Sequence, residues 1–149
     1  MNQGHTFRVV AWWSSGQTGI VKSDSAPNAV HFTAPVAFGG YEGRWTPEDL
    51  FLGAIASSFI TTCRALADQS GLEYTDLQVE VEGTTNPTSV GYRFGGVVIR
   101  VNLSIAQEAQ HERGFKLLDK AKEVCPIFQT LAIQPSLDRV VMVGVPTPA

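Results

Sequence analysis

The stretch that most constrains the fold runs from Leu50 to Cys63, where no residue carries a charge. A helix at the surface of a globular protein shows a polar face at every turn, and here charge returns only at Arg64. A membrane span would need roughly 20 apolar residues, whereas serines and threonines interrupt the middle of this run. The pattern therefore predicts a helix inside a protein core, covered on nearly all sides and not placed in a membrane.

Residues at both ends of this stretch carry the signals of a helix. Thr46 is a suitable N-cap, Pro47 suits the first helical position, and Asp49 can complete a capping box with Thr46. Glu48 lies in the first turn, where the helix dipole favours a carboxylate. Gly71 fits the left-handed position that follows a helix. These signals predict a helix that starts just after Thr46 and ends before Gly71.

Length and charge limit the class of protein. A chain of 149 residues predicts one domain, residues 1–149. The net charge of −3, without a basic stripe, argues against a nucleic-acid partner. The N-terminus lacks the apolar region of a signal peptide, which predicts a cytoplasmic protein. The three histidines are scattered and the glycines match no phosphate loop, so neither a metal nor a cofactor is expected.

Alternating apolar residues predict strands on both sides of the central helix. The expected strands cover Phe7–Trp13, Ile20–Ser23, Ala29–Thr33, Leu77–Glu82, Val97–Ile105 and Leu137–Val145. An amphipathic helix is expected over Gln107–Val124, with Phe115, Leu118, Ala121 and Val124 on one side, and a short helix over Pro126–Ala132. Residues Thr84–Ser89, which include Asn86-Pro87, read as a loop. Strands that cluster around helices, rather than alternating with them, predict an α+β fold.

Two cysteines and a carboxylate are the candidates for chemistry. Cys125 precedes Pro126, so it is expected to cap the short helix, whose first amides would stabilise a thiolate. The alternative is that Cys125 only fills a helix junction, and the sequence does not decide between them. Cys63 lies within the uncharged helix, where burial favours the neutral thiol. Arg44, four residues before Glu48, is a possible ion-pair partner for that carboxylate.

The segment from Pro47 to Ser57, followed far downstream by Cys125-Pro126, resembles the OsmC/Ohr family. The resemblance implies antiparallel sheets wrapped around a long central helix, in an intertwined homodimer. A second subunit would then cover the helix that has no charged face. The resemblance also implies thiol-dependent reduction of organic hydroperoxides in the defence against oxidative stress. In this chemistry a peroxidatic cysteine becomes a sulfenic acid, which a second cysteine resolves as a disulfide.

Only part of the implied catalytic set is present in this sequence. Glu48 matches the family glutamate and Cys125 the resolving cysteine, but the peroxidatic position is Ser58. The place of the family arginine is occupied by Gln17, for which Arg44 is a candidate replacement.

Cys63 cannot simply replace a cysteine at Ser58. It lies five residues further along the helix, which means a shift of about 7.5 Å and a turn of about 140°. Three possibilities follow for the chemistry. Cys125 reacts with peroxide alone and is reduced by an external thiol, or Cys63 and Cys125 pair after a shift in helix register. Alternatively, the reaction has been lost and the protein binds a small hydrophobic ligand at the dimer interface.

Overall fold

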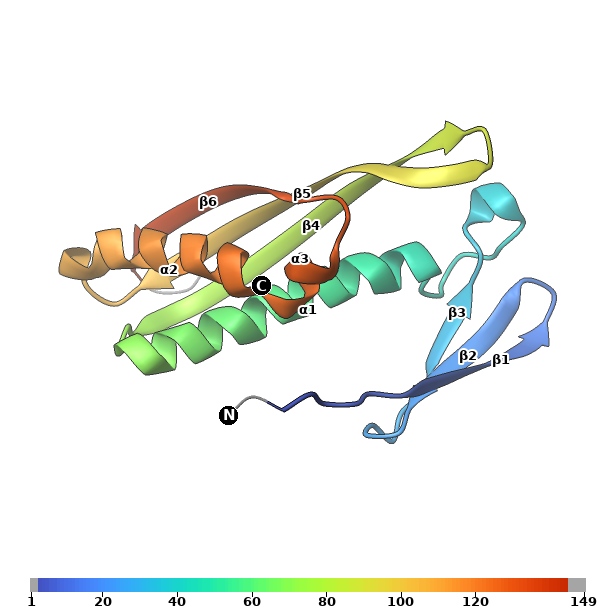
Figure 1. Cartoon of the computed structure of the whole chain (residues 1–149), viewed down its shortest axis with the longest axis horizontal. Coiled ribbons are helices and arrows are strands. Elements are labelled where there is room, and N and C mark those ends of the chain that lie inside the picture. The colour runs from blue at the N-terminus through green and yellow to red at the C-terminus, as the bar shows by residue number, and fades with distance from the viewer. Residues whose placement is uncertain (1–2, 145–149) are drawn as a thin grey trace. The chain divides into compact units, whose positions relative to one another are not determined.

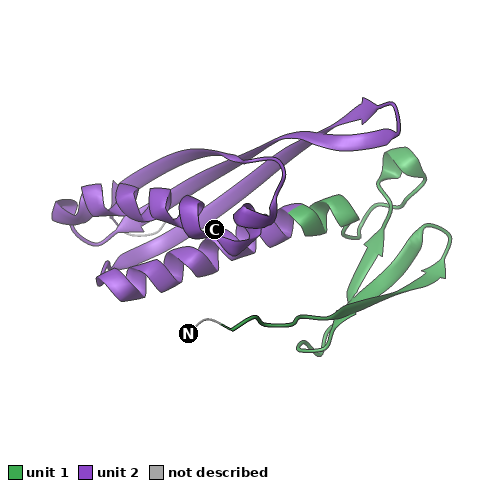
Figure 2. Ribbon diagram, viewed as in Figure 1, with its two compact units in different colours: residues 1–51 green, residues 52–149 purple. Residues whose placement is uncertain are grey.

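The computed structural model describes residues 3–144. The chain divides into two compact units, Met1–Phe51 and Leu52–Ala149, shown in different colours in Figure 2 and described separately below. The elements are β1 (Val9–Ser15), β2 (Thr18–Ser23), β3 (Val30–Thr33), the 3₁₀ helix η1 (Val36–Phe38), α1 (Pro47–Ser70), β4 (Tyr74–Thr88), β5 (Gly91–Ile105), the 3₁₀ helix η2 (Glu108–Gln110), α2 (His111–Val124), α3 (Pro126–Thr130) and β6 (Ser136–Val143).

The first unit contains a three-stranded antiparallel sheet in the order β1-β2-β3. The first strand begins at Val9 rather than at the predicted Phe7. Alternating apolar residues along this strand would suit one buried face, but in the single chain Val9 and Trp13 are 65% and 76% exposed. A three-stranded sheet cannot bury one of its faces by itself, so the apolar side chains that alternate along β1 stay exposed within this unit.

The second unit is built on a sheet in the order β4-β5-β6. Strands β4 and β5 form a long antiparallel hairpin, and β6 pairs with β5 in parallel. The loop predicted at Thr84–Ser89 is wrong, because β4 continues to Thr88 and Pro87 pairs with Tyr92. Strand β4 is at the edge of the three-stranded sheet, where a residue without an N–H group is tolerated.

Two helices of this unit pack against one face of the sheet (Figure 1). The inward-facing residues of β5 are buried, as the alternation predicts: Val97, Ile99, Val101, Leu103 and Ile105. Helix α1 buries Ile55, Phe59, Cys63 and Ala67, and helix α2 buries Gly114, Leu117, Leu118 and Ala121. These sheets and helices confirm the predicted α+β class.

Helix α2 differs from its prediction in start and orientation. It begins at His111 after a single 3₁₀ turn, rather than at Gln107. Leu118 and Ala121 of the predicted side are buried, whereas Phe115 is only half-buried. The Arg139 guanidinium lies over the Phe115 ring, with the guanidinium carbon 4.6 Å from the ring centroid. The short helix α3 ends at Thr130, before the predicted Ala132, since Leu131 is extended. The predicted end of the last strand, Val145, lies outside the described residues.

The predicted ends of α1 are confirmed. The Thr46 hydroxyl accepts a hydrogen bond from the Asp49 amide at 3.0 Å, and the Asp49 carboxylate accepts one from the Thr46 amide at 2.9 Å. At the other end Gly71 has a φ of +72°, and the Leu72 amide donates to the Ala67 carbonyl at 3.1 Å. This last bond is the one that defines a Schellman motif.

Helix α1 has an open, uncharged face within the single chain. Residues Ala54, Ser57, Thr61 and Ala65 are exposed. By length and composition α1 could cross a membrane, but its opposite side is packed on the sheet as in the core helix of a globular protein. The sequence predicts that nearly all sides of this helix are covered, but a single chain buries only one side of α1.

Candidate functional site

The structure brings together two side chains that are far apart in the sequence, Ser58 and Cys125. The hydroxyl oxygen of Ser58 lies 3.1 Å from the sulfur of Cys125, and either group can donate the hydrogen bond. Helix α1 presents Ser58 on the side of the helix next to its buried residues. Cys125 comes from the junction between α2 and α3. The peroxidatic position implied by the resemblance thus faces the Cys-Pro cysteine, with a serine in place of a thiol.

Cys125 is held by backbone hydrogen bonds from both adjoining helices. Its amide donates to the Ala121 carbonyl at 2.9 Å, and its carbonyl accepts from the Gln129 amide at 3.2 Å. Cys125 is the N-cap of α3, as predicted. The predicted stabilisation of its sulfur by the amides of α3 is not observed, because the side chain makes no capping hydrogen bond. Its hydrogen-bond partner is the Ser58 hydroxyl instead.

Cys63 lies on the buried side of α1, with 0% of its surface exposed. Burial, and to a smaller extent the electrostatic effect of Cys125, raises the pKa of the Cys63 thiol to about 12. Cys63 is therefore a neutral thiol at physiological pH, as its position in the uncharged helix predicts. Both cysteines are free thiols, and Cys125 is also 0% exposed.

An aromatic pair next to the two residues was missed by the sequence analysis. The rings of Phe59 and Phe128 are stacked, with centroids 5.8 Å apart and planes inclined by 24°. Phe59 follows Ser58 in α1, and Phe128 lies three residues after Cys125 in α3. Both rings are fully buried. The stack joins α1 to α3 beside the Ser58–Cys125 contact and so fixes which turn of α1 faces Cys125.

The other predicted site residues lie in the first unit. Gln17 is exposed in the turn between β1 and β2, and this turn lines a cavity of about 280 Å³ together with Pro47, the first residue of α1. Glu48 is half-buried in the first turn of α1, and its Oε1 is buried without a hydrogen-bond partner. Arg44 lies in a bend before the helix, and the predicted Arg44–Glu48 ion pair does not form within 4.0 Å.

The described residues also bear on metal binding. Among residues 3–144, histidine, cysteine, aspartate and glutamate do not gather in any group of three or more that could hold a metal ion.

A comparison with known protein families identifies the family to which this fold belongs. The family model for OsmC-like proteins matches residues 40–138, which include α1, the sheet β4-β5-β6 up to Asp138 and the Cys-Pro junction. The chain belongs to the OsmC-like family. The element order is the one that the resemblance implies, and Ser58 lies opposite Cys125.

Related proteins agree with this assignment. A relative in Bacillus subtilis, the uncharacterized protein YmaD, is 27% identical over 130 residues, which are 85% of this chain and 87% of the relative. An OsmC-like protein of unknown function from Vibrio cholerae has a similar structure, with a TM-score of 0.82 over 92% of this chain and all of that chain, at 14% identity. An organic hydroperoxide resistance protein from Legionella pneumophila has a TM-score of 0.75 over 95% of this chain and all of that chain, at 22% identity. At these identities the solved structures establish the shared fold.

Proposed function

We propose that this OsmC-like chain reduces organic hydroperoxides through the thiol of Cys125, with the Ser58 hydroxyl as its hydrogen-bond partner. The observation that carries the proposal is the 3.1 Å contact between these two side chains. Membership of the OsmC-like family supports it, as does the fold shared with a protein of organic hydroperoxide resistance. The proposed role is in the defence against oxidative stress.

The proposed reaction begins with the thiolate form of Cys125. Its sulfur attacks one oxygen of the peroxide, so that an S–O bond forms and the O–O bond breaks. The leaving alkoxide takes up a proton and departs as an alcohol, and Cys125 is oxidised to a sulfenic acid. Throughout this step the Ser58 hydroxyl can donate a hydrogen bond to the sulfur, which stabilises negative charge there. Serine itself cannot form a sulfenic acid, so Ser58 assists and is not oxidised.

An external thiol completes the proposed cycle. It attacks the sulfenic acid to give a mixed disulfide and water, and a second thiol then releases Cys125 as a thiol. Cys63 is a poor candidate for this step, because a pKa of about 12 leaves it protonated at neutral pH and the thiolate is the nucleophile. The small-molecule thiols of a reducing cytoplasm fit this role, and cytoplasmic location is part of the proposal.

We further propose that a second copy of the chain covers the open face of α1. That face is uncharged from Leu50 to Cys63, and several of its residues are exposed in the single chain. A homodimer is the assembly that the family resemblance implies. It would bury this uncharged helix face, which one chain alone leaves exposed to water.

A second candidate function is favoured by the burial of the thiols. Cys63 and Cys125 are both 0% exposed, so neither sulfur meets a peroxide in this conformation. An OsmC-like protein without this chemistry would bind a small hydrophobic ligand at the interface between two copies. The two candidates differ in the fate of Cys125 in the presence of peroxide.

The deciding experiment exposes the reduced protein to one equivalent of cumene hydroperoxide and traps sulfenic acid with dimedone. Mass spectrometry then assigns the modified cysteine. Dimedone addition at Cys125, lost in Cys125→Ser and retained in Cys63→Ser, supports the peroxidase. A disulfide between Cys63 and Cys125 would instead support peroxide chemistry in which a shift in the register of α1 brings Cys63 next to Cys125. If both thiols stay unmodified, the result supports the second candidate, a protein that binds a hydrophobic ligand. Unfolded protein treated in the same way is the positive control for dimedone trapping.

A further inference from the structure

A groove with a volume of about 350 Å³ lies between α1 and α2 within the second unit. A volume of this order lies at the lower end of the range for small-molecule sites. Its lining is Leu66, Gln69 and Ser70 from the last turns of α1, with Arg113, Lys116, Leu117 and Lys120 from α2. None of these residues is acidic, although the chain as a whole has a net charge of −3.

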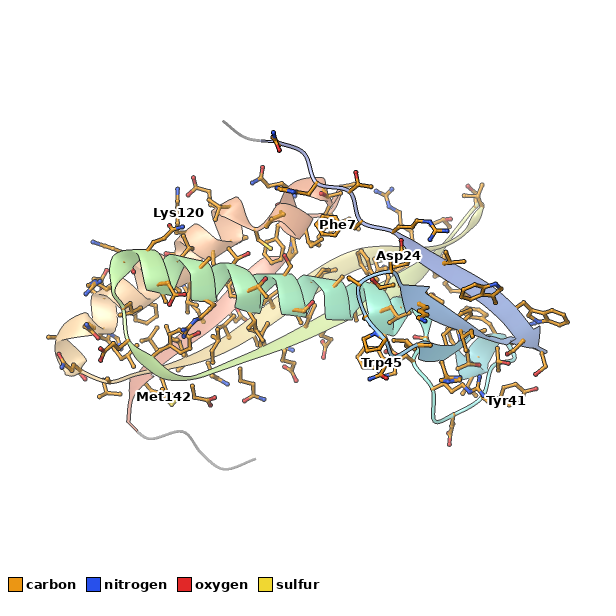
Figure 3. All side chains as sticks on the ribbon, turned by 90° about the horizontal axis from the view of Figure 1, so that it is seen from below. Phe7, Asp24, Tyr41, Trp45, Lys120 and Met142 are labelled. Carbon is orange, nitrogen blue, oxygen red and sulfur yellow. The ribbon has the colours of Figure 1, made fainter. Side chains whose placement is uncertain are left out.

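The three cations share one side of α2. Arg113, Lys116 and Lys120 are spaced by three and four residues, so they follow one another along the helix surface. Lys120, labelled in Figure 3, extends from this side. Two leucines provide the apolar part of the groove, Leu117 with 7% exposure and the half-buried Leu66. Positive charge therefore lies beside an apolar surface.

The acidic residues near the groove leave most of this charge uncompensated. Arg113 donates a hydrogen bond to the Ser70 carbonyl at the C-terminus of α1, which holds the guanidinium at the edge of the groove but does not neutralise it. Lys120 pairs with Glu123 at 3.5 Å, and both side chains are more than half exposed. Exposed pairs of this kind are weak. Among the described residues Lys116 has no carboxylate partner within 4.0 Å.

We propose that this groove binds a small organic acid with an apolar tail. Its carboxylate would lie against Lys116 and Arg113, and its tail would cover Leu66 and Leu117. Charge-assisted hydrogen bonds to the two cations would orient the acid group. Burial of the tail on the leucines would supply the apolar contribution. This site is separate from Ser58 and Cys125, so the proposal does not depend on peroxide chemistry.

Octanoate is a suitable probe, followed by the methyl NMR signals of Leu66 and Leu117 in the full-length protein. We expect saturable shifts of these signals below the concentration at which octanoate forms micelles. Lys116→Gln should weaken octanoate binding by about tenfold or more, the effect of losing one charge-assisted hydrogen bond. Lys122→Gln is the matched control, because it removes the same charge from a position of α2 outside the groove.

Three results would overturn the proposal. The first is an absence of saturable shifts at Leu66 and Leu117. The second is equal affinity for octanol, which has the same tail without the charge. The third is an equal loss of affinity in Lys116→Gln and Lys122→Gln. If a second copy of the chain fills the groove instead, the signals will shift on dilution and will not respond to octanoate.

Discussion

The hydroxyl oxygen of Ser58 lies 3.1 Å from the sulfur of Cys125, although the two residues are 67 positions apart in the sequence. The contact joins the middle of α1 to the junction of α2 and α3, and the stacked rings of Phe59 and Phe128 lie next to it. The packing of α1 against this junction therefore places a hydroxyl beside a thiol. These are the two positions that the family resemblance implies for peroxide chemistry.

Ser58→Cys should restore a two-cysteine site. The new sulfur would be next to Cys125, where a sulfenic acid at position 58 can be resolved as a disulfide. We expect turnover of cumene hydroperoxide with a dithiol reductant to rise by about tenfold or more, which corresponds to a barrier lower by ~1.4 kcal/mol. A peroxide-consumption assay measures the rate, and mass spectrometry detects the bond between positions 58 and 125.

Ser57→Cys is the matched control for this variant. Ser57 is exposed on the adjacent face of α1, and its hydroxyl donates to the Gly53 carbonyl at 2.8 Å rather than to Cys125. A thiol there tests the effect of an added cysteine alone. If Ser58→Cys is no more active than Ser57→Cys, the surroundings of position 58 have diverged from those that peroxide reduction requires.

The raised pKa of Cys63 predicts a loss of stability at alkaline pH. The unfolded thiol loses its proton near its ordinary pKa of 9.0, whereas the native thiol keeps it until about pH 12. Between these values the native state binds more protons than the unfolded state. The contribution of Cys63 to the free energy of unfolding is therefore fully present below pH 9.0. Between pH 9.0 and about pH 12 this contribution should fall by about 1.4 kcal/mol per pH unit.

Denaturant unfolding at neutral pH and at several values above pH 9.0 measures this contribution. Cys63→Ala is the reference, since the two proteins differ only at this residue, and the difference between them isolates the contribution of the Cys63 thiol, including its interaction with Cys125. The stability difference between the two proteins should shrink as the pH rises. A difference independent of pH would mean that Cys63 is not held in the neutral form by burial.

Local chemistry made part of this fold predictable. The ends of α1 follow from side chains and backbone within one or two turns, at Thr46, Asp49 and Gly71. The buried face of β5 follows from its alternation. In contrast, β4 extends through Pro87 because of pairing with Tyr92 on β5, and a short window around Asn86-Pro87 contains no information about that partner.

The candidate site was predictable only through the family resemblance. No spacing rule places Ser58 against Cys125, because the contact depends on how α1 packs against α3. The Phe59–Phe128 stack was missed for the same reason, although each ring lies within three residues of a candidate. Burial of Cys63 was predictable because it lies in a long segment without charged residues, which favours a place in the protein core.

Gly114 provides a test of how closely α2 packs on the sheet. A Cβ atom at this position would lie 2.9 Å from Cγ1 of Val141 and 3.4 Å from Cδ2 of Leu103. Gly114→Ala should therefore lower stability by about 1–3 kcal/mol through overpacking, although alanine is the better helix former by about 1 kcal/mol. Thermal and denaturant unfolding measure the change.

The double variant Gly114→Ala/Val141→Ala separates the steric effect from other causes. Removing the Val141 methyl groups takes away the atom in closest contact. Gly114→Ala should then cost less in the Val141→Ala background than in the natural sequence. Equal costs in both backgrounds would mean that contact with Val141 does not limit the approach of α2.

The open face of α1 gives a test of the proposed homodimer. Thr61 is exposed in the single chain, so Thr61→Arg should leave the fold of the chain intact. If a second copy covers this face, the new charge is buried without a partner, which is strongly unfavourable. We expect the natural protein to elute as a dimer in size-exclusion chromatography with light scattering, and Thr61→Arg to shift it toward the monomer. Gln78→Arg adds the same charge to an exposed position of β4 and should leave the dimer unchanged. A natural protein that is monomeric at assay concentration would exclude the dimer, and the uncharged face of α1 would then need a different cover.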